Sequence, residues 1–328
     1  MGYRAHKEKA EEKQRRGKRI IVSIVAFLVL GLLIFAAFCP PETWKYYVAL
    51  PDVQAREDGE LRIHFIDVGQ GDSTLIELPD GKVMLIDGGD DTLTAKKQIL
   101  RYLNALDIDV IDYLVITHAD GDHCGGIEEI VKWKEVVNAY LPTTSKTVDS
   151  EYAEAYTALA QTNCALIEAS RLVTFGGGET PYTLAFLYPY ANSDAKENND
   201  ASSVLWLDYM GVSALFMGDA PQEVETLLVR DDKLGFLQKM GVDLSSTEIV
   251  KVAHHGSGYS SSTAFIEYLN VQTAVVSCGK DNPYGHPADR VIRDLTAAGA
   301  NVYRTDENGH IIITVSSDKT TEITTLKG

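Results

Sequence analysis

Residues 117–126 read Thr117-His118-Ala119-Asp120-Gly121-Asp122-His123-Cys124-Gly125-Gly126, with two imidazoles and two carboxylates inside six positions. The stretch follows the apolar run Tyr113-Leu114-Val115-Ile116, which has the composition of a buried strand. A ligand-rich loop at a strand end is a common way to build a metal site, because imidazole and carboxylate both bind divalent cations. Glycines let the backbone pass close to an ion. The stretch therefore predicts a metal site and favours a hydrolytic metalloenzyme.

An apolar segment near the N-terminus has the length of a membrane span. Ile20 to Phe38 contains no charge and only Ser23 as a polar side chain, and about 20 apolar residues cross a bilayer. The basic flank before it is expected on the cytoplasmic side. A cleaved signal peptide is the alternative, but Phe38 is bulky where cleavage needs a small residue. We expect a cytoplasmic tail over 1–19, an uncleaved single-pass anchor over 20–38 in the cell membrane, and an extracellular remainder.

The charge of the chain limits its partners. The formal net charge is −17, and because residues 1–19 are net positive, the remainder carries about −22. Proteins hold phosphates largely through Lys and Arg, so an acidic domain is a poor general binder of polyanions. This counts against a nuclease that grips long duplex DNA, although a locally basic groove is compatible with an acidic protein.

The cysteines do not indicate a disulfide framework or a zinc knuckle. There are four, and none stands in a Cys-x-x-Cys pair. Cys124 directly follows the expected metal loop. With better ligands beside it, we expect Cys124 to be a small packed side chain.

The chain after the anchor alternates between strand and helix patterns. Residues 39–59, with three prolines, are expected to form a short stalk. Paired strands followed by strand–helix units occur twice, which favours an α/β fold with two sheets packed face to face and helices outside. The expected strands are 61–66, 73–78, 82–86, 110–116, 136–141, 183–187, 203–209, 212–216, 249–253, 273–277, 301–303 and 310–315. The expected helices are 92–106, 127–133, 151–161, 222–229, 262–269 and 290–298.

Four further stretches place polar groups at strand ends. They are 67–73, 86–89, Met217-Gly218-Asp219 and His254-His255-Gly256-Ser257. Loops at one end of a sheet converge, so these stretches are expected to share a cleft with residues 117–126. An Asp-Gly or Gly-Asp after a strand is as often a simple turn, and a lone His pair is usually structural. The prediction therefore depends mainly on residues 117–126.

These motifs together resemble the metallo-β-lactamase superfamily, and specifically the hydrolase domain of ComEC-type competence (DNA internalization-related) proteins. The resemblance covers about residues 61–315. It implies a four-layer αβ/βα sandwich over residues 60–317, with the metal site at the edge between the sheets, and a C-terminal tail over 318–328. The matching residues are 65–73, 85–89, 117–126, Gly218-Asp219, 254–257, Ser260-Ser261-Ser262, Tyr284-Gly285-His286-Pro287 and 302–306.

The resemblance also implies two divalent metal ions, zinc or manganese. The superfamily pattern is His-x-His-x-Asp-His, and Asp120 stands where that pattern has its second histidine. His118 and Asp120 would bind one ion, and Asp122 and His123 the other. Asp219 matches the carboxylate that bridges the two ions. A carboxylate is a harder ligand than an imidazole and suits Mn²⁺ better. The additional carboxylate therefore makes Mn²⁺ a competitor of Zn²⁺ for this site.

The last implied ligand is one of the adjacent His254 and His255. Neighbouring side chains on a strand point to opposite faces, so we expect His255 to coordinate and His254 to line the cleft. The superfamily often supplies a further histidine in between, but no histidine occurs between His123 and His254. Asn199 and Ser202 lie in a polar loop of this region and receive no role.

Catalytic roles are expected for Asp122, His286 and His254. Asp122 would orient the nucleophile as well as bind metal. His286 lies in a family motif outside the ligand set and would donate to the phosphate or the leaving group, the alternative being a loop histidine beside Pro287. Asp72 and Asp87 are expected to contact the ligand histidines on the side away from the metal and so to orient their rings.

The favoured function is a membrane-anchored extracellular phosphodiesterase or nuclease that acts on DNA or another phosphodiester through a metal-activated water. The alternatives on the same scaffold are hydrolysis of another ester, a lactone, a thioester, a β-lactam or cell-wall phosphocholine. A metal-dependent sensor or adhesion module is a third hypothesis, and the full set of water-activating groups argues against it. The sequence identifies no protein partner.

Overall fold

The computed structural model describes residues 2–38, 44–143, 148–171, 174–175, 182–190 and 197–327. The chain divides into two compact units, Met1–Ala49 and Leu50–Gly328. Cys39 and the start of the expected stalk, up to residue 43, lie outside the described residues.

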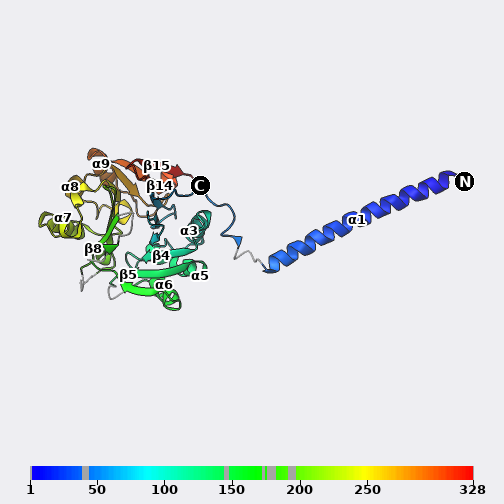
Figure 1. Ribbon diagram of the computed structural model, residues 1–328, viewed down its shortest axis with the longest axis horizontal. Helices are drawn as coiled ribbons and strands as arrows, with labels where there is room; N and C mark the ends of the chain where they lie inside the picture. The colour runs from blue at the N-terminus through cyan, green and yellow to red at the C-terminus, as the bar shows by residue number, and fades with distance from the viewer. Residues whose placement is uncertain are drawn as a thin grey trace. The chain divides into compact units, whose positions relative to one another are not determined.

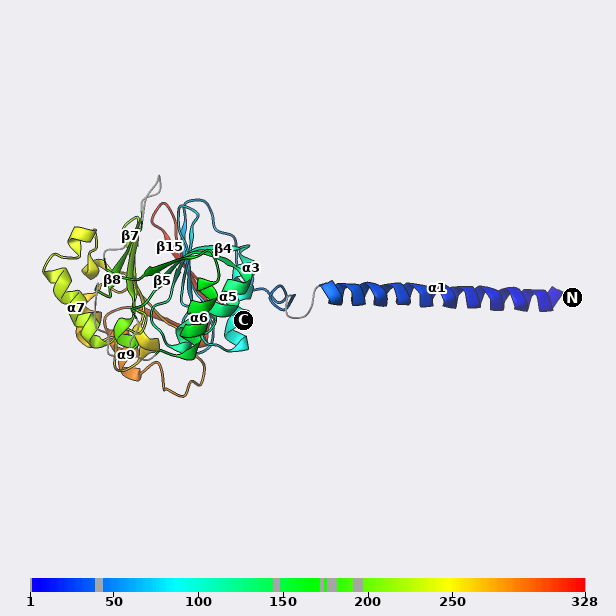
Figure 2. The ribbon, with the colours of Figure 1, turned by 90° about the horizontal axis from the view of Figure 1, so that it is seen from below.

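The first unit contains one long helix, α1 (Gly2–Phe38) (Figures 1 and 2). Its segment Glu12–Ala37 is long enough and apolar enough to cross a membrane, and none of its most apolar window is buried within the protein. The apolar side chains expected to span a bilayer thus lie on this helix and are free to face lipid.

The second unit contains two mixed β-sheets. Within the described residues the first sheet has eight strands, in the order β15-β14-β1-β2-β3-β4-β5-β6. The second has seven, in the order β13-β12-β11-β10-β9-β8-β7. The strands of the first sheet are β1 (Leu61–Phe65), β2 (Thr74–Glu77), β3 (Val83–Ile86), β4 (Val110–Val115), β5 (Glu135–Leu141), β6 (Ala165–Glu168), β14 (His310–Val315) and β15 (Thr321–Leu326). Those of the second are β7 (Thr174–Phe175), β8 (Tyr182–Tyr188), β9 (Val204–Tyr209), β10 (Val212–Phe216), β11 (Ile249–Lys251), β12 (Thr273–Val276) and β13 (Asn301–Arg304).

The two sheets repeat one pairing pattern. In the first, β1, β2 and β3 are antiparallel and β3 to β6 are parallel. In the second, β8, β9 and β10 are antiparallel and β10 to β13 are parallel. The expectation of two comparable halves is confirmed.

Helices cover the outer faces of both sheets and complete a four-layer αβ/βα sandwich (Figures 1 and 2). On the side of the first sheet lie α3 (Leu93–Ala105), α5 (Ile127–Trp133) and α6 (Ser150–Ala160). On the side of the second lie α7 (Gln222–Lys233), α8 (Thr263–Tyr268) and α9 (Asp289–Ala297). The expected fold class is confirmed, and each of these six helices connects two neighbouring parallel strands, a connection that requires a crossover.

The inner faces of the sheets pack against each other through large apolar side chains. Phe65 of β1 lies 6.4 Å, between ring centroids, from Phe216 of β10. The outer face of β1 is buried as well, because the Nδ1 atom of His64 lies 2.9 Å from the hydroxyl of Tyr102 on α3. Every residue of β1 is therefore buried, although Leu61–Phe65 alternates between apolar and polar side chains.

The expectation of a tail over residues 318–328 is corrected by the structure. Thr321–Leu326 form β15, which pairs antiparallel with β14 along its whole length. The segment was not expected as a strand because its side chains are largely exposed and few are apolar. Its β-branched residues nevertheless suit an edge strand. Two short strands, β6 and β7, and the one-turn helix α10 (Thr305–Asn308) were also not anticipated.

The short loops that follow β1, β3, β4, β10 and β11 carry the motif residues. His310, at the start of β14, helps to fix the first of these loops, because its Nδ1 accepts a hydrogen bond of 3.0 Å from the backbone N–H of Asp67. The histidine accepts only when this nitrogen is unprotonated. Burial, aided by the neighbouring His64, lowers the pKa of His310 to about 4.

A His310→Asn variant keeps an acceptor for the Asp67 N–H and removes the titration. In the unfolded chain the ring has a pKa of about 6.5, so between pH 7 and pH 5 protons bind the unfolded state preferentially and the parent loses stability. We expect this residue to account for about 2 kcal/mol of that loss. Urea unfolding of both proteins at pH 7 and pH 5 should show a correspondingly smaller drop for the variant. Equal drops would contradict the assignment.

Candidate metal centre

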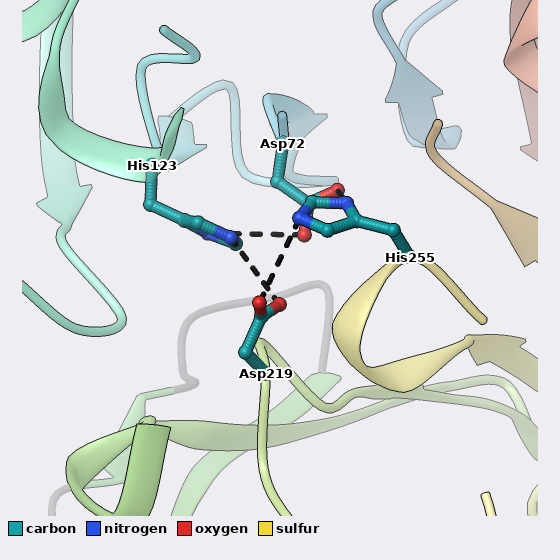
Figure 3. A group of neighbouring side chains, drawn as sticks. All are labelled: Asp72, His123, Asp219 and His255. Carbon is teal, nitrogen blue, oxygen red and sulfur yellow. Dashed lines mark ion pairs between the residues drawn. The ribbon is translucent and has the colours of Figure 1, made fainter. Parts of the chain in front are cut away.

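The structure brings the sequence-predicted residues of five loops to one place, at the seam between the two sheets. Figure 3 shows Asp72, His123, Asp219 and His255 converging from four different segments, and one ligand atom from each lies within 4.8 Å of the others. The other predicted members of the site surround this group: His118, Asp120, Asp122 and His254.

Asp219 is the common neighbour of the histidines. It is buried on the loop after β10, and its Oδ1 lies 3.2 Å from Nε2 of His123. Its Oδ2 lies 3.6 Å from Nε2 of His255, 3.7 Å from Nε2 of His254 and 3.9 Å from Nε2 of His118. One carboxylate thus faces four imidazoles from both sheets, which is the position expected of a bridging ligand.

The donor atoms are spaced as ligands of a shared cation. Asp122 Oδ2 lies 3.1 Å from His255 Nε2, and Asp120 Oδ2 lies 3.4 Å from His118 Nε2. Metal–ligand bonds of about 2.1 Å place neighbouring donors of one ion roughly 3.0 to 3.5 Å apart.

Several of these atoms lack a hydrogen-bond partner within the described structure. Buried polar atoms nearly always have hydrogen-bond partners, yet four atoms that face the centre have none among the described residues. They are Nε2 of His118, His123 and His255 and Oδ1 of Asp219. Divalent cations satisfy such atoms, so the residues present fit the metal ions that the sequence predicts.

The Nδ1 nitrogens of the three buried histidines, His118, His123 and His255, contact protein groups. Asp87 Oδ2 lies 2.8 Å from Nδ1 of His123, and the same carboxylate accepts hydrogen bonds from the backbone and hydroxyl of Thr117. Thr117 Oγ1 lies 3.0 Å from Nδ1 of His118. Nδ1 of His255 donates to the carbonyl of Ser277 at 2.9 Å. Such contacts fix the tautomer and turn each Nε2 toward the centre.

The electrostatics of the centre favour anionic carboxylates. Burial alone would raise the pKa of Asp219, but His123 and His255 outweigh it and hold that pKa well below its usual range. Burial would likewise lower the pKa of His123, but Asp219 and Asp87 raise it well above its usual value. A metal ion competes with the proton for the same imidazole nitrogen, so metal binding here releases protons.

The local conformation of His254 and His255 corrects the expectation that they alternate along a strand. Strand β11 ends at Lys251, and both histidines lie in the turn Ala253–Gly256 with φ of 51°. In this left-handed turn both rings reach Asp219. They differ in exposure instead: His255 is buried, whereas His254 is partly exposed to the cleft.

Asp72 approaches the same rings from behind. Its carboxylate lies 3.8 Å from Nδ1 of His123 and 3.7 Å from Nδ1 of His255, whereas the metal-facing atoms are the Nε2 nitrogens. One of its oxygens accepts a hydrogen bond from the ammonium of Lys251, a buried residue of β11. Lys251 was not predicted as part of the site, although a charged residue inside the otherwise apolar stretch Ile249–Val252 was a signal for it.

Polar groups of the loop before β9 contact Asp120 and Asp219. Asn198 donates a hydrogen bond of 2.6 Å to Asp120 Oδ1, a contact that the sequence analysis did not foresee. Ser202 Oγ accepts from the backbone N–H of Asp219 at 3.2 Å, and Oδ1 of Asn199 is buried without a partner among the described residues. Cys124 is buried, and its thiol donates to the carbonyl of Asp120, which fits a packed side chain.

His286 lies beside the centre without belonging to the group around Asp219. Its ring centroid is 5.6 Å from that of His254 and 6.3 Å from that of His255. Tyr284 stacks against it at 5.8 Å. Burial, together with His254 and His255, lowers the pKa of His286, so the ring is neutral near pH 7. Its Nδ1 has no hydrogen-bond partner in the described structure.

Residues 66–170 match the family model of the metallo-beta-lactamase superfamily. The chain contains a metallo-β-lactamase superfamily domain. The matched range includes the ligand-rich residues 117–126, and the fold and the resemblance inferred from the motifs are confirmed. The superfamily is one of metal-dependent hydrolases, and the cluster around Asp219 takes its ligand-type side chains from both halves of the domain.

Relatives and solved structures agree with this assignment. ComE operon protein 3 of Bacillus subtilis is 30% identical over 269 residues, which are 77% of this chain and 33% of that protein. Recombination protein 2 of Haemophilus influenzae is 29% identical over 261 residues, 79% of this chain and 29% of that protein. The chain therefore spans about a third of the length of these curated relatives. The metallo-beta-lactamase fold protein YhfI from Bacillus subtilis superposes with a TM-score of 0.51 at 10% identity, covering 78% of this chain and 100% of that one.

Replacing Asp219 with Asn should weaken metal binding at least about tenfold, because it removes the carboxylate that faces all four imidazoles. The metal-to-protein ratio after dialysis against one equivalent of Mn²⁺ or Zn²⁺ measures this. Asp281→Asn, at an exposed carboxylate, is the matched control and should bind like the parent. Undiminished metal content in the Asp219 variant would remove it from the ligand set.

Proposed function

We propose that this protein is a membrane-anchored phosphodiesterase that acts outside the cell with two divalent cations, zinc or manganese. One ion would be held by His118, Asp120 and Asp219, and the other by Asp122, His123, His255 and Asp219. The observation that carries the proposal is the pair of donor groups on either side of Asp219, one around His118 and one around His255. The basic segment before the apolar part of α1 supports a cytoplasmic N-terminus and an external catalytic domain.

Divalent cations bound here would supply Lewis acidity, which lowers the pKa of water and neutralises charge on a phosphoryl oxygen. Asp122 is suited to orient the attacking water. Its carboxylate is partly exposed, and although burial opposes ionisation, His255 and His123 hold its pKa far below the usual range. It is therefore an acceptor at every pH near neutrality.

His254 and His286 line the open side of the centre as neutral rings. Burial is the main cause that lowers the pKa of each. A neutral imidazole donates one hydrogen bond and accepts another, so the free Nδ1 of His286 can contact a phosphate or the oxygen of a leaving group. This role for His286 requires a substrate that reaches the cleft beside His254.

Exposed aromatic rings beside the centre support a substrate that carries nucleobases. Tyr284, which stacks on His286, is 66% exposed, and Tyr259, four residues after His255, is 84% exposed. Stacking of a base on an aromatic ring contributes about 1 to 3 kcal/mol without sequence preference. Stacking also suits an acidic domain, because it holds a strand without an extended basic groove. An unpaired DNA strand therefore fits better than a duplex.

The decisive assay offers the chain in detergent, with Mn²⁺ or Zn²⁺, to single-stranded DNA, a small chromogenic phosphodiester and a β-lactam. We expect cleavage of both phosphodiesters, and a fall of at least about 100-fold in the Asp122→Ala variant. Asp281→Ala controls for the loss of a carboxylate in general. Cleavage by Asp122→Ala at the parental rate, or cleavage of the β-lactam alone, would overturn the proposal.

Replacing Tyr284 with Ala should separate binding of bases from the chemistry. We expect KM for a single-stranded oligonucleotide to rise about 5- to 100-fold, as the loss of one stacking contact predicts. Turnover of the small chromogenic phosphodiester should stay within about twofold of the parent, because that substrate has no base to stack. Tyr156→Ala, at an exposed tyrosine of α6, is the control. Equal effects on both substrates would show that Tyr284 supports the fold instead.

A further inference from the structure

A buried ion pair joins the two sheets directly behind the metal centre. Lys251 ends β11 of the second sheet and is 3% exposed. Its ammonium contacts Oδ2 of Asp72, a buried residue of the loop between β1 and β2 of the first sheet. A buried ammonium is costly unless it is paired, so this contact places both side chains.

The environment of Lys251 is strongly anionic. Burial disfavours its charged form, but Asp72 first, and then Asp219 and Asp87, raise the pKa of the ammonium. The amine is therefore a permanent positive charge at neutral pH.

Asp72 is placed where a carboxylate would ordinarily bind metal. One ligand atom from each of Asp72, His123, Asp219 and His255 falls within a common 4.8 Å (Figure 3). Oδ1 of Asp72 is buried and has no hydrogen-bond partner among the described residues. Yet the carboxylate faces the Nδ1 edges of the two imidazoles, and its other oxygen is occupied by Lys251.

Lys251 places a positive charge of the protein itself beside the carboxylates of the centre. Five carboxylates stand there: Asp72, Asp87, Asp120, Asp122 and Asp219. Two divalent cations would balance four of these charges, and the ammonium of Lys251 would balance that of its partner Asp72. Removing the ammonium would leave the buried carboxylate of Asp72 unpaired, which is strongly unfavourable.

We propose that Lys251 is a built-in cation of the metal centre, which holds Asp72 out of the ligand set and so limits the number of metal ions and ligands there. It is a positioning residue, since it acts through Asp72. Removing its charge would free Asp72 to rotate toward the centre and bind metal. The inference rests on the proposed function only in requiring that the centre binds divalent cations, whatever substrate it hydrolyses.

The test compares the parent with Lys251→Met in the full chain, freed of metal by chelation and titrated with Co²⁺. The readouts are the metal-to-protein ratio, the affinity by competition with a chelator, and the visible absorption of Co²⁺, which reports coordination. We expect Lys251→Met to bind metal roughly tenfold or more tightly, or to bind an additional ion, with a changed Co²⁺ spectrum. The double variant Asp72→Asn/Lys251→Met should return all three readouts to parental values.

Lys134→Met is the matched control. Lys134 is also a buried lysine, and its ammonium pairs with Asp109 and Asn104. The Lys134→Met variant should leave metal binding unchanged even if it destabilises the fold. Parental ratio, affinity and Co²⁺ spectrum in Lys251→Met would overturn the proposal.

Asp72→Asn alone gives a second, independent test if Lys251→Met does not fold. Because Asp72 is not a ligand in this arrangement, the Co²⁺ spectrum of this variant at saturating metal should match the parent. Its metal affinity should fall, because Lys251 is left unpaired and repels the cation. A changed Co²⁺ spectrum at saturation would show that Asp72 coordinates metal and would overturn the inference. The hydrolysis assays are separate: their failure would sink the phosphodiesterase proposal while leaving these metal measurements interpretable.

Discussion

The arrangement of this domain depends on the neutralisation of carboxylates that are buried where the two sheets meet. Asp219 and Asp87 are almost fully buried, and imidazoles, hydroxyls and backbone N–H groups surround them. Charged groups also meet across the two sheets: His118 and His123 face Asp219, and Lys251 faces Asp72. The hydrophobic contact between the sheets, such as Phe65 against Phe216, brings these groups together, and the charges then fix the alignment.

The fold and the identity of the central residues could be predicted because they depend on local patterns. Residues 117–126 carry their chemistry in one contiguous stretch, and the apolar strands before Asp87, His118 and Asp219 place those residues at strand ends. The weakly apolar Thr321–Leu326 lacked such a pattern, since an edge strand needs partners more than it needs apolar residues. Its pairing with β14 is a tertiary contact that the local sequence does not encode.

Contacts between distant segments explain the other differences. The turn at His254 and His255 takes positive φ at two successive non-glycine residues, which sequence propensity disfavours and which the surrounding packing imposes. Lys251 and Asp72 are 179 positions apart, so the local sequence around either residue does not predict their pairing. Asn198 likewise reaches Asp120 from a loop of the other half of the domain. Sequence patterns thus identify the groups of this site more readily than the partners that orient them.

The pairing of β14 with β1 has a consequence for the order in which the domain can fold. Strand β1 begins the domain, yet one of its two neighbours in the sheet is β14, which lies near the other end of the chain. The first sheet therefore cannot close around β1 until residues 310–315 have been synthesised. Until β14 arrives, that edge of β1 stays unpaired, so the sheet is completed by a pairing between segments that lie far apart in the sequence.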